Sequence, residues 1–129
     1  MNKESTHTLE LDFGPDGEAL IPVVTQDSRS REVLILAYAN RRAFEETRAS
    51  GQATYYSRSR QELWKKGLTS GDLLRVDEIL INCEQNSLVY LVTPLGKGAC
   101  HAKTKDGQPR RSCFYRRITP EGRLEFLEE

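Results

Sequence analysis

The sequence predicts a small α+β domain in which several short strands accompany one main helix. The helix is indicated by residues 41–50, which follow Asn40, a residue type that caps helices well, and precede Gly51, a residue type that often ends them. The strands are indicated by short runs of β-branched, aliphatic and aromatic residues between polar turns. A strand-rich chain with a single clear helix is typical of the α+β class.

The chain has 129 residues, which fits one domain over residues 1–129. A chain of this length buries a smaller fraction of its surface than a long one, so its core is modest. A core shared between two subunits would add to it.

Three strands are predicted in the N-terminal part of the chain. Residues 9–13 alternate apolar with polar side chains, and residues 14–17 form a Gly- and Pro-containing turn. Residues 20–26 predict a second strand, in which Pro22 favours a position at the sheet edge. Residues 33–38 are a continuous apolar run, which is typical of a strand buried on both faces.

The helix over 41–50 places Phe44 and Thr47 on one face. After it, residues 53–57 predict a strand, and residues 61–66 predict one helical turn or a loop.

The C-terminal half predicts a hairpin, a loop and a last strand. Residues 76–82 and 87–93 predict two strands around the polar turn 84–86. Residues 94–111 are rich in Gly, Lys, Arg and Pro and predict a mobile loop, and residues 113–118 predict the last strand.

Charge and hydropathy exclude two classes of partner. Lys plus Arg is 19 and Asp plus Glu is 19, so the formal net charge is zero, whereas a nucleic-acid-binding protein normally shows a basic excess. No run approaches the roughly 18 apolar residues of a membrane span, so no membrane partner is expected. Residues 1–10 are polar and lack the apolar core of a signal peptide, so we expect a cytoplasmic protein.

Three cysteines are the first candidates for chemistry. Disulfides are rare in the cytoplasm, so Cys83, Cys100 and Cys113 are either small buried hydrophobic residues or ligands of a metal. Cys100 lies in a Gly-rich segment and Cys83 at a polar turn, and both are poor positions for core residues. Three thiolates fit a catalytic zinc site, which leaves one position for water.

Further candidates surround these cysteines in the sequence. His101 follows Cys100 directly and is a candidate general acid or base, because its pKa lies near neutral pH. Alternating hydroxyls and guanidiniums suit phosphate oxygens, and a Trp beside cations, hydroxyls and glycines suits a base and a phosphate. The candidate substrate-binding residues are Ser57, Arg58, Arg60, Trp64, Lys66, Thr69 and Ser70. The alternative for Ser57, Arg58 and Arg60 is a solvated strand edge, and the alternative for Trp64 is ordinary packing.

Six motifs resemble the phosphoribosyl-AMP cyclohydrolase family. They are VLILAYAN (33–40), YSRSR (56–60), LWKKGLTSG (63–71), NCEQNS (82–87), ACH (99–101) and RSCFYR (111–116). They follow the family order from about Leu20 to Ile118, and the second and third are long and specific.

The resemblance implies a homodimer whose active sites lie at the subunit interface. It implies zinc held by Cys83 of one subunit with Cys100 and Cys113 of the other, and hydrolysis of the N1–C6 bond in the adenine ring of 1-(5-phosphoribosyl)-AMP, a step of histidine biosynthesis. His101 is then the candidate that protonates N1, and Arg58, Arg60 and Lys66 are candidates for the substrate phosphates. No fused pyrophosphohydrolase domain is expected.

Two departures from the family pattern concern magnesium and a loop. The family commonly has three aspartates around the first cysteine, which bind magnesium, whereas this chain has Asn82, Glu84 and Asn86. Magnesium prefers hard oxygen ligands with one or two carboxylates, so we expect this site to be lost or weak. The segment between Cys100 and Cys113 is longer than usual. Its cations either meet substrate phosphates or belong to a solvated insertion; they are Lys103, Lys105, Arg110 and Arg111.

Two other functions compete with this one. The first is a zinc-dependent paralogue acting on another purine nucleotide, which the changed magnesium positions favour and the retained motifs of residues 56–71 oppose. The second is a metal- or nucleotide-binding module without catalysis, which His101 opposes because a binder needs no proton carrier.

Overall fold

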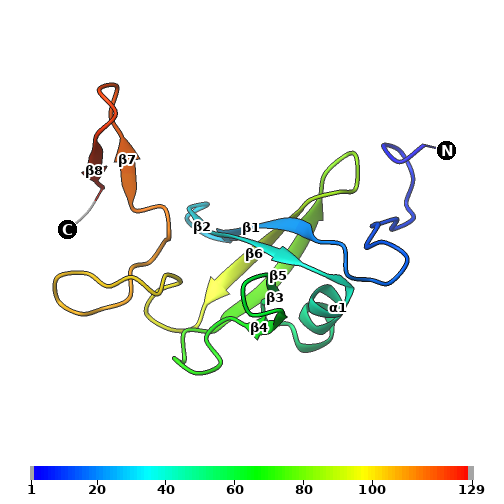
Figure 1. Cartoon of the computed structure of the whole chain (residues 1–129), viewed down its shortest axis with the longest axis horizontal. Helices are drawn as coiled ribbons and strands as arrows, with labels where there is room; N and C mark the ends of the chain where they lie inside the picture. The colour runs from blue at the N-terminus through cyan, green and yellow to red at the C-terminus, as the bar shows by residue number, and fades with distance from the viewer. Residues whose placement is uncertain (1, 128–129) are drawn as a thin grey trace.

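A four-stranded mixed sheet forms the centre of the computed structural model, which describes residues 2–127. Its strands are β1 (Ile21–Asp27), β2 (Val33–Ala39), β5 (Leu74–Ile81) and β6 (Leu88–Pro94), in the order β2-β1-β6-β5 (Figure 1). Strand β1 pairs antiparallel with β2 and parallel with β6, and β5 pairs antiparallel with β6. With one helix among several strands, the predicted α+β class is confirmed.

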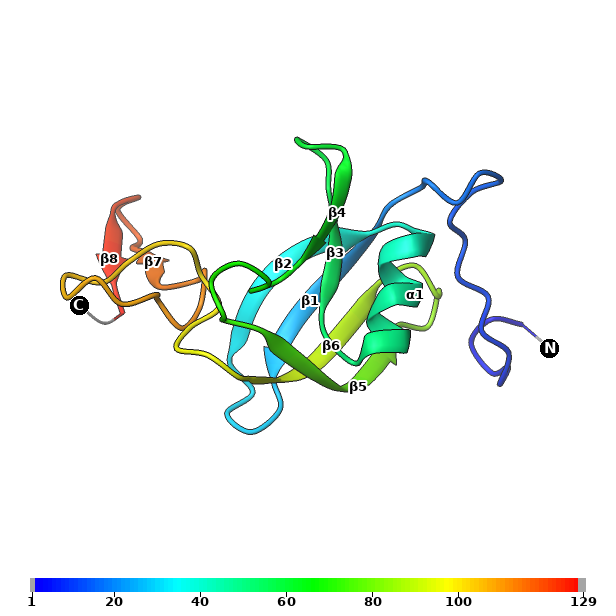
Figure 2. The same ribbon diagram turned by 90° about the horizontal axis from the view of Figure 1, so that it is seen from below.

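Helix α1 (Arg41–Ser50) and the hairpin of β3 (Thr54–Ser57) and β4 (Glu62–Lys65) lie over one face of this sheet (Figure 2). The helix begins and ends as predicted. Asn40 Oδ1 accepts the Ala43 N–H at 2.9 Å, and Gly51 takes the left-handed conformation with φ of 74°.

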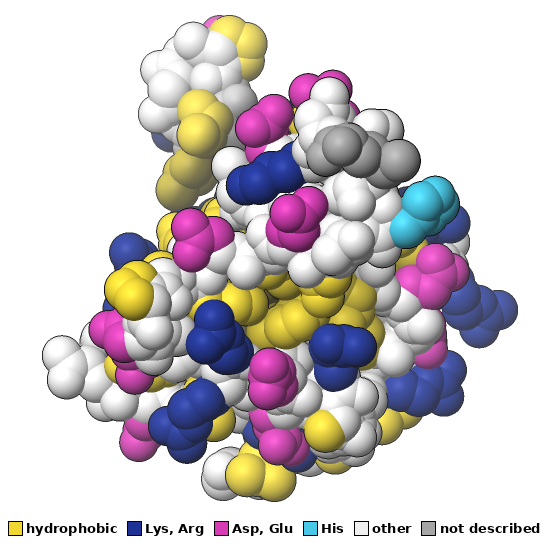
Figure 3. Space-filling view, turned by 90° about the vertical axis from the view of Figure 1, so that its right-hand side faces the viewer, with side chains coloured by type: hydrophobic (Ala, Val, Ile, Leu, Met, Phe, Trp, Pro, Cys, Tyr) yellow, Lys and Arg dark blue, Asp and Glu magenta, His cyan; other side chains and the backbone are white. Residues whose placement is uncertain are grey.

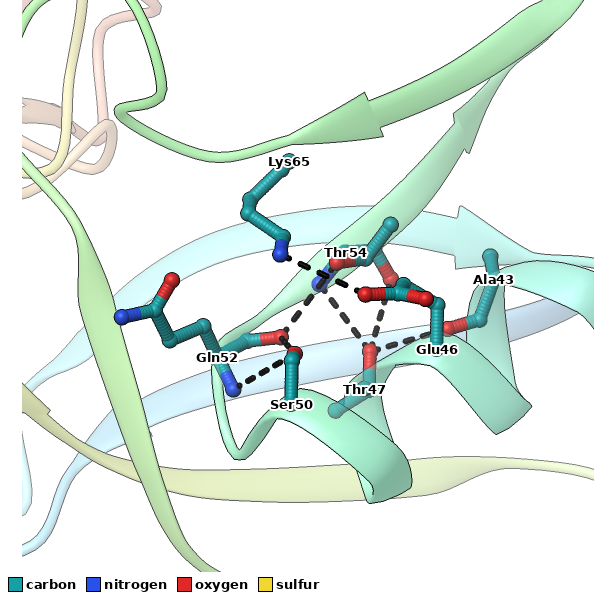
Figure 4. A network of polar contacts seen from close by, with 7 residues as sticks. All are labelled: Ala43, Glu46, Thr47, Ser50, Gln52, Thr54 and Lys65. Atoms are coloured by element: carbon teal, nitrogen blue, oxygen red, sulfur yellow. Dashed lines mark hydrogen bonds and ion pairs between the residues drawn. The ribbon is translucent and has the colours of Figure 1, made fainter.

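The core lies between the sheet and these covering elements. Its largest fully buried side chains include Tyr55, Tyr90, Leu34 and Leu74. Thr47 fastens the helix to β3, because its hydroxyl donates to the Ala43 carbonyl at 2.9 Å and accepts the Thr54 N–H at 3.0 Å (Figure 4). These bonds satisfy polar groups that burial would otherwise leave unpaired.

A C-terminal hairpin of β7 (Arg116–Ile118) and β8 (Leu124–Phe126) stands apart from the sheet, at the left of Figure 1. The predicted strand over 113–118 is therefore wrong for its first three residues, which are not in a strand. Strand β8 was not predicted, because it has only three residues and its pairing with β7 defines it.

Two predictions about strand position are wrong. Strand β1 is central rather than at an edge; Pro22 is tolerated because pairing with β6 begins only at Val23, so that Pro22 has a neighbour on one side alone. Strand β2 is the edge strand and is not buried on both faces, since Leu36 is 51% exposed. An apolar run does not distinguish burial in one chain from burial against a second.

Two predictions about local structure are also wrong. Residues 9–13 form no strand, because no strand of the described chain pairs with them and the Glu10 N–H donates instead to the Gln85 side chain at 2.6 Å. Residues 62–65 form β4 rather than a helical turn or a loop, because they pair with β3 from Thr54–Lys65 to Ser57–Glu62. The hairpin strands over 76–82 and 87–93 are confirmed as β5 and β6, with ends shifted by one or two residues.

Candidate metal centre and substrate site

The segments that carry Cys100 and Cys113 run side by side. The Cys100 N–H donates to the Arg110 carbonyl at 3.0 Å, and the Cys113 N–H donates to the Leu34 carbonyl of β2 at 2.8 Å. A Cβ at position 98 would lie 2.5 Å from the Arg110 carbonyl oxygen, so only glycine permits this approach. The long segment between the two cysteines is thus a folded loop that returns to its starting point.

The Cys100 thiol is a near neighbour of the Cys113 thiol and influences its ionisation. Cys100 is buried, whereas Cys113 as a residue is exposed. Partial burial of the thiol, together with the neighbouring Cys100, raises the pKa of Cys113 to about 12. Two adjacent thiols with one surface side are part of the donor set that a thiolate-binding metal such as zinc requires, and a bound cation favours their deprotonation.

Lys66 lies beside this thiol pair and is only 8% exposed. Burial lowers the pKa of Lys66, while Asp72, Cys113 and Cys100 act in the opposite direction. Asp72 is fixed by the Lys97 N–H, which donates to its Oδ1 at 2.9 Å, and a side chain at Gly96 would collide with it. A cation at this position would offset the negative charge of the thiols once they are deprotonated. Sequence reasoning did not single out Asp72, because its role depends on two loops that meet only in the fold.

Cys83 lies at the opposite end of the sheet. It sits in the turn between β5 and β6, next to Leu88, which pairs with Val23 at the start of β1. Cys100 follows the other end of β6, where Cys113 bonds to Leu34 of β2, so about 20 Å of strand separates the two places. Within residues 2–127, no three of the His, Cys, Asp and Glu side chains come close enough to hold a metal ion.

The N-terminal segment forms an open hollow of about 300 Å³ against the Cys83 turn. Mostly polar residues line this hollow. Figure 3 faces this end of the molecule and shows apolar side chains gathered near its centre, with charged side chains of both signs around them. His7 lines the same hollow as Cys83. His101, in contrast, is exposed next to Cys100.

The predicted substrate residues lie along the β3–β4 hairpin and the turn after it. Arg58 and Arg60 are exposed near the hairpin tip, and the Arg58 guanidinium stacks 4.4 Å from the Tyr38 ring centroid. Trp64 packs on Tyr55 with 5.6 Å between ring centroids and remains 38% exposed. The other members are Ser57 at the end of β3 and the exposed Thr69 and Ser70 before Asp72. Their roles stay predictions.

The comparisons with known proteins agree with the motifs. A family model described as phosphoribosyl-AMP cyclohydrolase matches residues 35–115. The chain belongs to this family. It is 48% identical over 115 residues to the phosphoribosyl-AMP cyclohydrolase of Halobacterium salinarum, covering 85% of this chain and 84% of the relative. It is 50% identical over 110 residues to that of Archaeoglobus fulgidus, covering 85% and 94%.

The phosphoribosyl-AMP cyclohydrolase family is a family of hydrolases, and one relative connects it with histidine biosynthesis. The histidine biosynthesis bifunctional protein HisIE of Aquifex aeolicus is 44% identical over 110 residues, covering 85% of this chain and 50% of the relative. In residues 2–127, no helix is both long and apolar enough to cross a membrane.

The family's magnesium positions do not fit magnesium in this chain. Asn82 Oδ1 accepts the N–H groups of Asn86 and Ser87 at 2.8 and 2.9 Å, and Asn82 Nδ2 donates to Asn86 Oδ1 at 2.6 Å. Both amide oxygens are thus engaged within the turn, and Glu84 is the single carboxylate. Magnesium gives up its water reluctantly and then mainly to carboxylates.

The contacts of Arg110 and Arg111 show where these two cations of the long loop lie. Arg110 is 9% exposed and stacks 4.2 Å from the Tyr115 ring centroid and 5.1 Å from that of Phe126. Arg111 pairs with Glu32 at 2.7 Å. Arg110 therefore joins the loop to the C-terminal hairpin and is poorly placed for a substrate phosphate, whereas Lys103 and Lys105 are exposed.

Proposed function

We propose that this chain hydrolyses the N1–C6 bond of the adenine ring in 1-(5-phosphoribosyl)-AMP, a step of histidine biosynthesis. Family membership supports the reaction class. The observation that carries the proposal is the pair of thiols, Cys100 and Cys113, beside a buried lysine and the exposed His101. In the overall reaction water adds to C6, the C6–N1 bond breaks, and N1 takes up a proton.

The proposed metal is zinc, held by Cys83, Cys100 and Cys113. Three thiol ligands leave one position open, as catalytic zinc sites do. When bound, zinc supplies hydroxide at neutral pH by lowering the pKa of water to about 7. Lys66 offsets the charge of the thiolates. His101, next to Cys100, carries the proton to N1, and Arg58 and Arg60 bind phosphate oxygens through their guanidinium groups.

The proposed assembly is a homodimer. Because Cys83 lies at the far end of the sheet from the thiol pair, one chain cannot gather the three ligands, and a second chain is needed. Exposed apolar side chains support such an interface. They lie on β2 and β5 and on the C-terminal hairpin, and they include Leu36, Leu80, Ile81, Ile118 and Phe126.

The test is to assay the purified protein for ring opening of phosphoribosyl-AMP and to measure its zinc content. We expect turnover with one zinc per chain, and loss of both in Cys100→Ser. His101→Ala is expected to lose most of the turnover and to change the pH profile of the residual activity, while keeping zinc. Zinc content that is unchanged in Cys83→Ser, Cys100→Ser and Cys113→Ser would exclude the metal site.

One observation keeps a second candidate open. The amide side chains at positions 82 and 86 depart from the family, which favours a paralogue that opens another purine nucleotide. The same assay decides: a zinc-containing protein that leaves phosphoribosyl-AMP intact but converts another purine nucleotide would be this paralogue. A protein that binds nucleotide without turning it over would be a binding module.

A further inference from the structure

The turn that carries Cys83 is closed by its own side chains. Asn82 bonds two backbone N–H groups and the amide of Asn86, as described above, and the Gln85 N–H donates to the Asn82 carbonyl at 3.0 Å. An asparagine that accepts backbone N–H groups a few residues ahead stabilises a turn in the way that a bound cation stabilises a carboxylate-lined loop. No carboxylate repulsion within this turn needs a cation to offset it.

Gln85 ties the same turn to the N-terminal segment. It is 6% exposed, and its Oε1 accepts the Glu10 N–H at 2.6 Å. Its Nε2 donates to the carbonyls of Thr8 at 3.3 Å and Lys3 at 3.5 Å. One buried side chain thus holds residues 3–10 against the turn, and these residues form one wall of the hollow at Cys83.

We propose that Asn82 and Gln85 are positioning residues, which hold the Cys83 turn and the docked N-terminal segment in place without a divalent cation. The amides thereby replace the magnesium site of the family in shaping this turn. The role of the turn in presenting Cys83 to zinc rests on the proposed function, whereas its independence of magnesium does not.

The N-terminal segment lies outside the part of the chain that matches the family model, residues 35–115. The anchor for this segment, however, lies within the matched part, between two of the substituted magnesium positions. The amides at the magnesium positions and the side chain that holds the N-terminal segment therefore belong to the same turn. An amide side chain can donate as well as accept, which a carboxylate cannot, and Asn82 uses both capacities.

Amide hydrogen exchange on the intact protein tests the proposal. In zinc-free, magnesium-free protein, we expect the N–H groups of Glu10, Asn86 and Ser87 to be protected, with no change on adding magnesium. Asn82→Ala should speed exchange at Asn86 and Ser87 by about two- to tenfold, the range for one ordinary hydrogen bond. Asn82→Asp keeps the acceptor and should restore the protection. Protection that appears only with magnesium would overturn the proposal.

Gln85→Gly tests the docking of the N-terminal segment. Gln85 has φ of 55°, so glycine removes the side chain without straining the backbone. The matched control is Gln61→Gly, since Gln61 has φ of 53° in the other hairpin turn. We expect faster exchange at Glu10, and a changed charge-transfer spectrum of the cobalt-loaded protein, in the first variant only. Equal exchange at Glu10 in both variants would overturn the docking role.

The same readouts separate this proposal from the proposed function. Exchange is measured without zinc, so a protein that lacks cyclohydrolase activity still reports on the turn. A cobalt spectrum unchanged in Gln85→Gly, despite faster exchange at Glu10, would overturn the positioning role and leave the proposed reaction standing.

Discussion

The two ends of the central sheet hold their cysteines in different ways. At one end Cys100 and Cys113 lie near each other and near the buried Lys66, in loops that glycines allow to pack closely. At the other end Cys83 is exposed on a turn that amide side chains hold together. In the proposed zinc site, one end of the sheet would supply two ligands and a cation, and the other end would supply one ligand on a pre-shaped turn. The proposed zinc site thus needs two chains, although each chain contains every residue.

The largest expected effect comes from removing a cysteine at one end of the sheet in one variant and at the other end in a second variant. Cys83→Ser and Cys113→Ser should each lose zinc and activity. Mixing and re-associating the two should restore about a quarter of the activity, because half of the dimers are mixed and one of their two sites is intact. The readout is activity and zinc per chain after refolding the mixture.

The matched control for this mixture is Cys100→Ser with Cys113→Ser. Both changes affect the same end of the central sheet, so every site in the mixed dimer lacks a ligand and no activity should return. Recovery in this control as well would show that the two ends do not belong to different halves of one site.

The next effect concerns the cation beside the thiol pair. Lys66→Met should weaken zinc binding by about 10- to 100-fold, the range found for groups that support metal ligands, and Lys66→Arg should weaken it less. Competition with a zinc chelator measures this affinity. Lys65→Met is the control, because Lys65 pairs with Glu46 at 3.3 Å and not with the thiols. Equal losses in both lysine variants would contradict a specific role of Lys66.

A smaller effect, on the free energy of unfolding, is expected for a buried hydrogen bond in the core between the two ends of the sheet. Thr47→Val removes the acceptor of the buried Thr54 N–H, and leaving such a donor unpaired costs about 1–3 kcal/mol. Urea unfolding should show this loss. Ser50→Ala, in the exposed last turn of the same helix, should change the free energy of unfolding by less than about 0.5 kcal/mol. A loss in Ser50→Ala as large as in Thr47→Val would contradict the assignment.

The smallest expected effect is on the pH dependence of stability, which should differ between cysteine variants at the two ends of the sheet. In zinc-free protein the pKa of Cys113 is raised from 9.0 to about 12, so the folded state keeps a proton that the unfolded state releases. The stabilisation is present below pH 9 and is lost as the pH rises toward 12. Cys113→Ser should therefore flatten the alkaline decline, and Cys83→Ser, at an exposed thiol, should not. The lowered pKa of Lys66 acts in the opposite sense, so the comparison between variants is the quantity to measure.

Local signals predicted local structure well where no distant partner was involved. Asn40 and Gly51 define α1 because both caps act within one helical turn, and the polar turn between β5 and β6 was predicted from its composition. The strand β4 was missed because Glu62–Lys65 has no strong strand signal of its own; its pairing with β3 makes it a strand. The site residues were taken from motifs, and the structure shows only which of them lie together.

The sequence by itself determined the helix and its caps, most of the central strands, the family, and the residue types for a thiolate metal site, because these depend on neighbours along the chain. The tertiary structure decided that β1 is central and β2 an edge, that Lys66 is buried beside two thiols, and that Cys83 lies apart from them. It also decided that Gln85 anchors the N-terminal segment. Each of these depends on segments far apart in the chain, whose approach is set by strand pairing and close packing rather than by local residue preference.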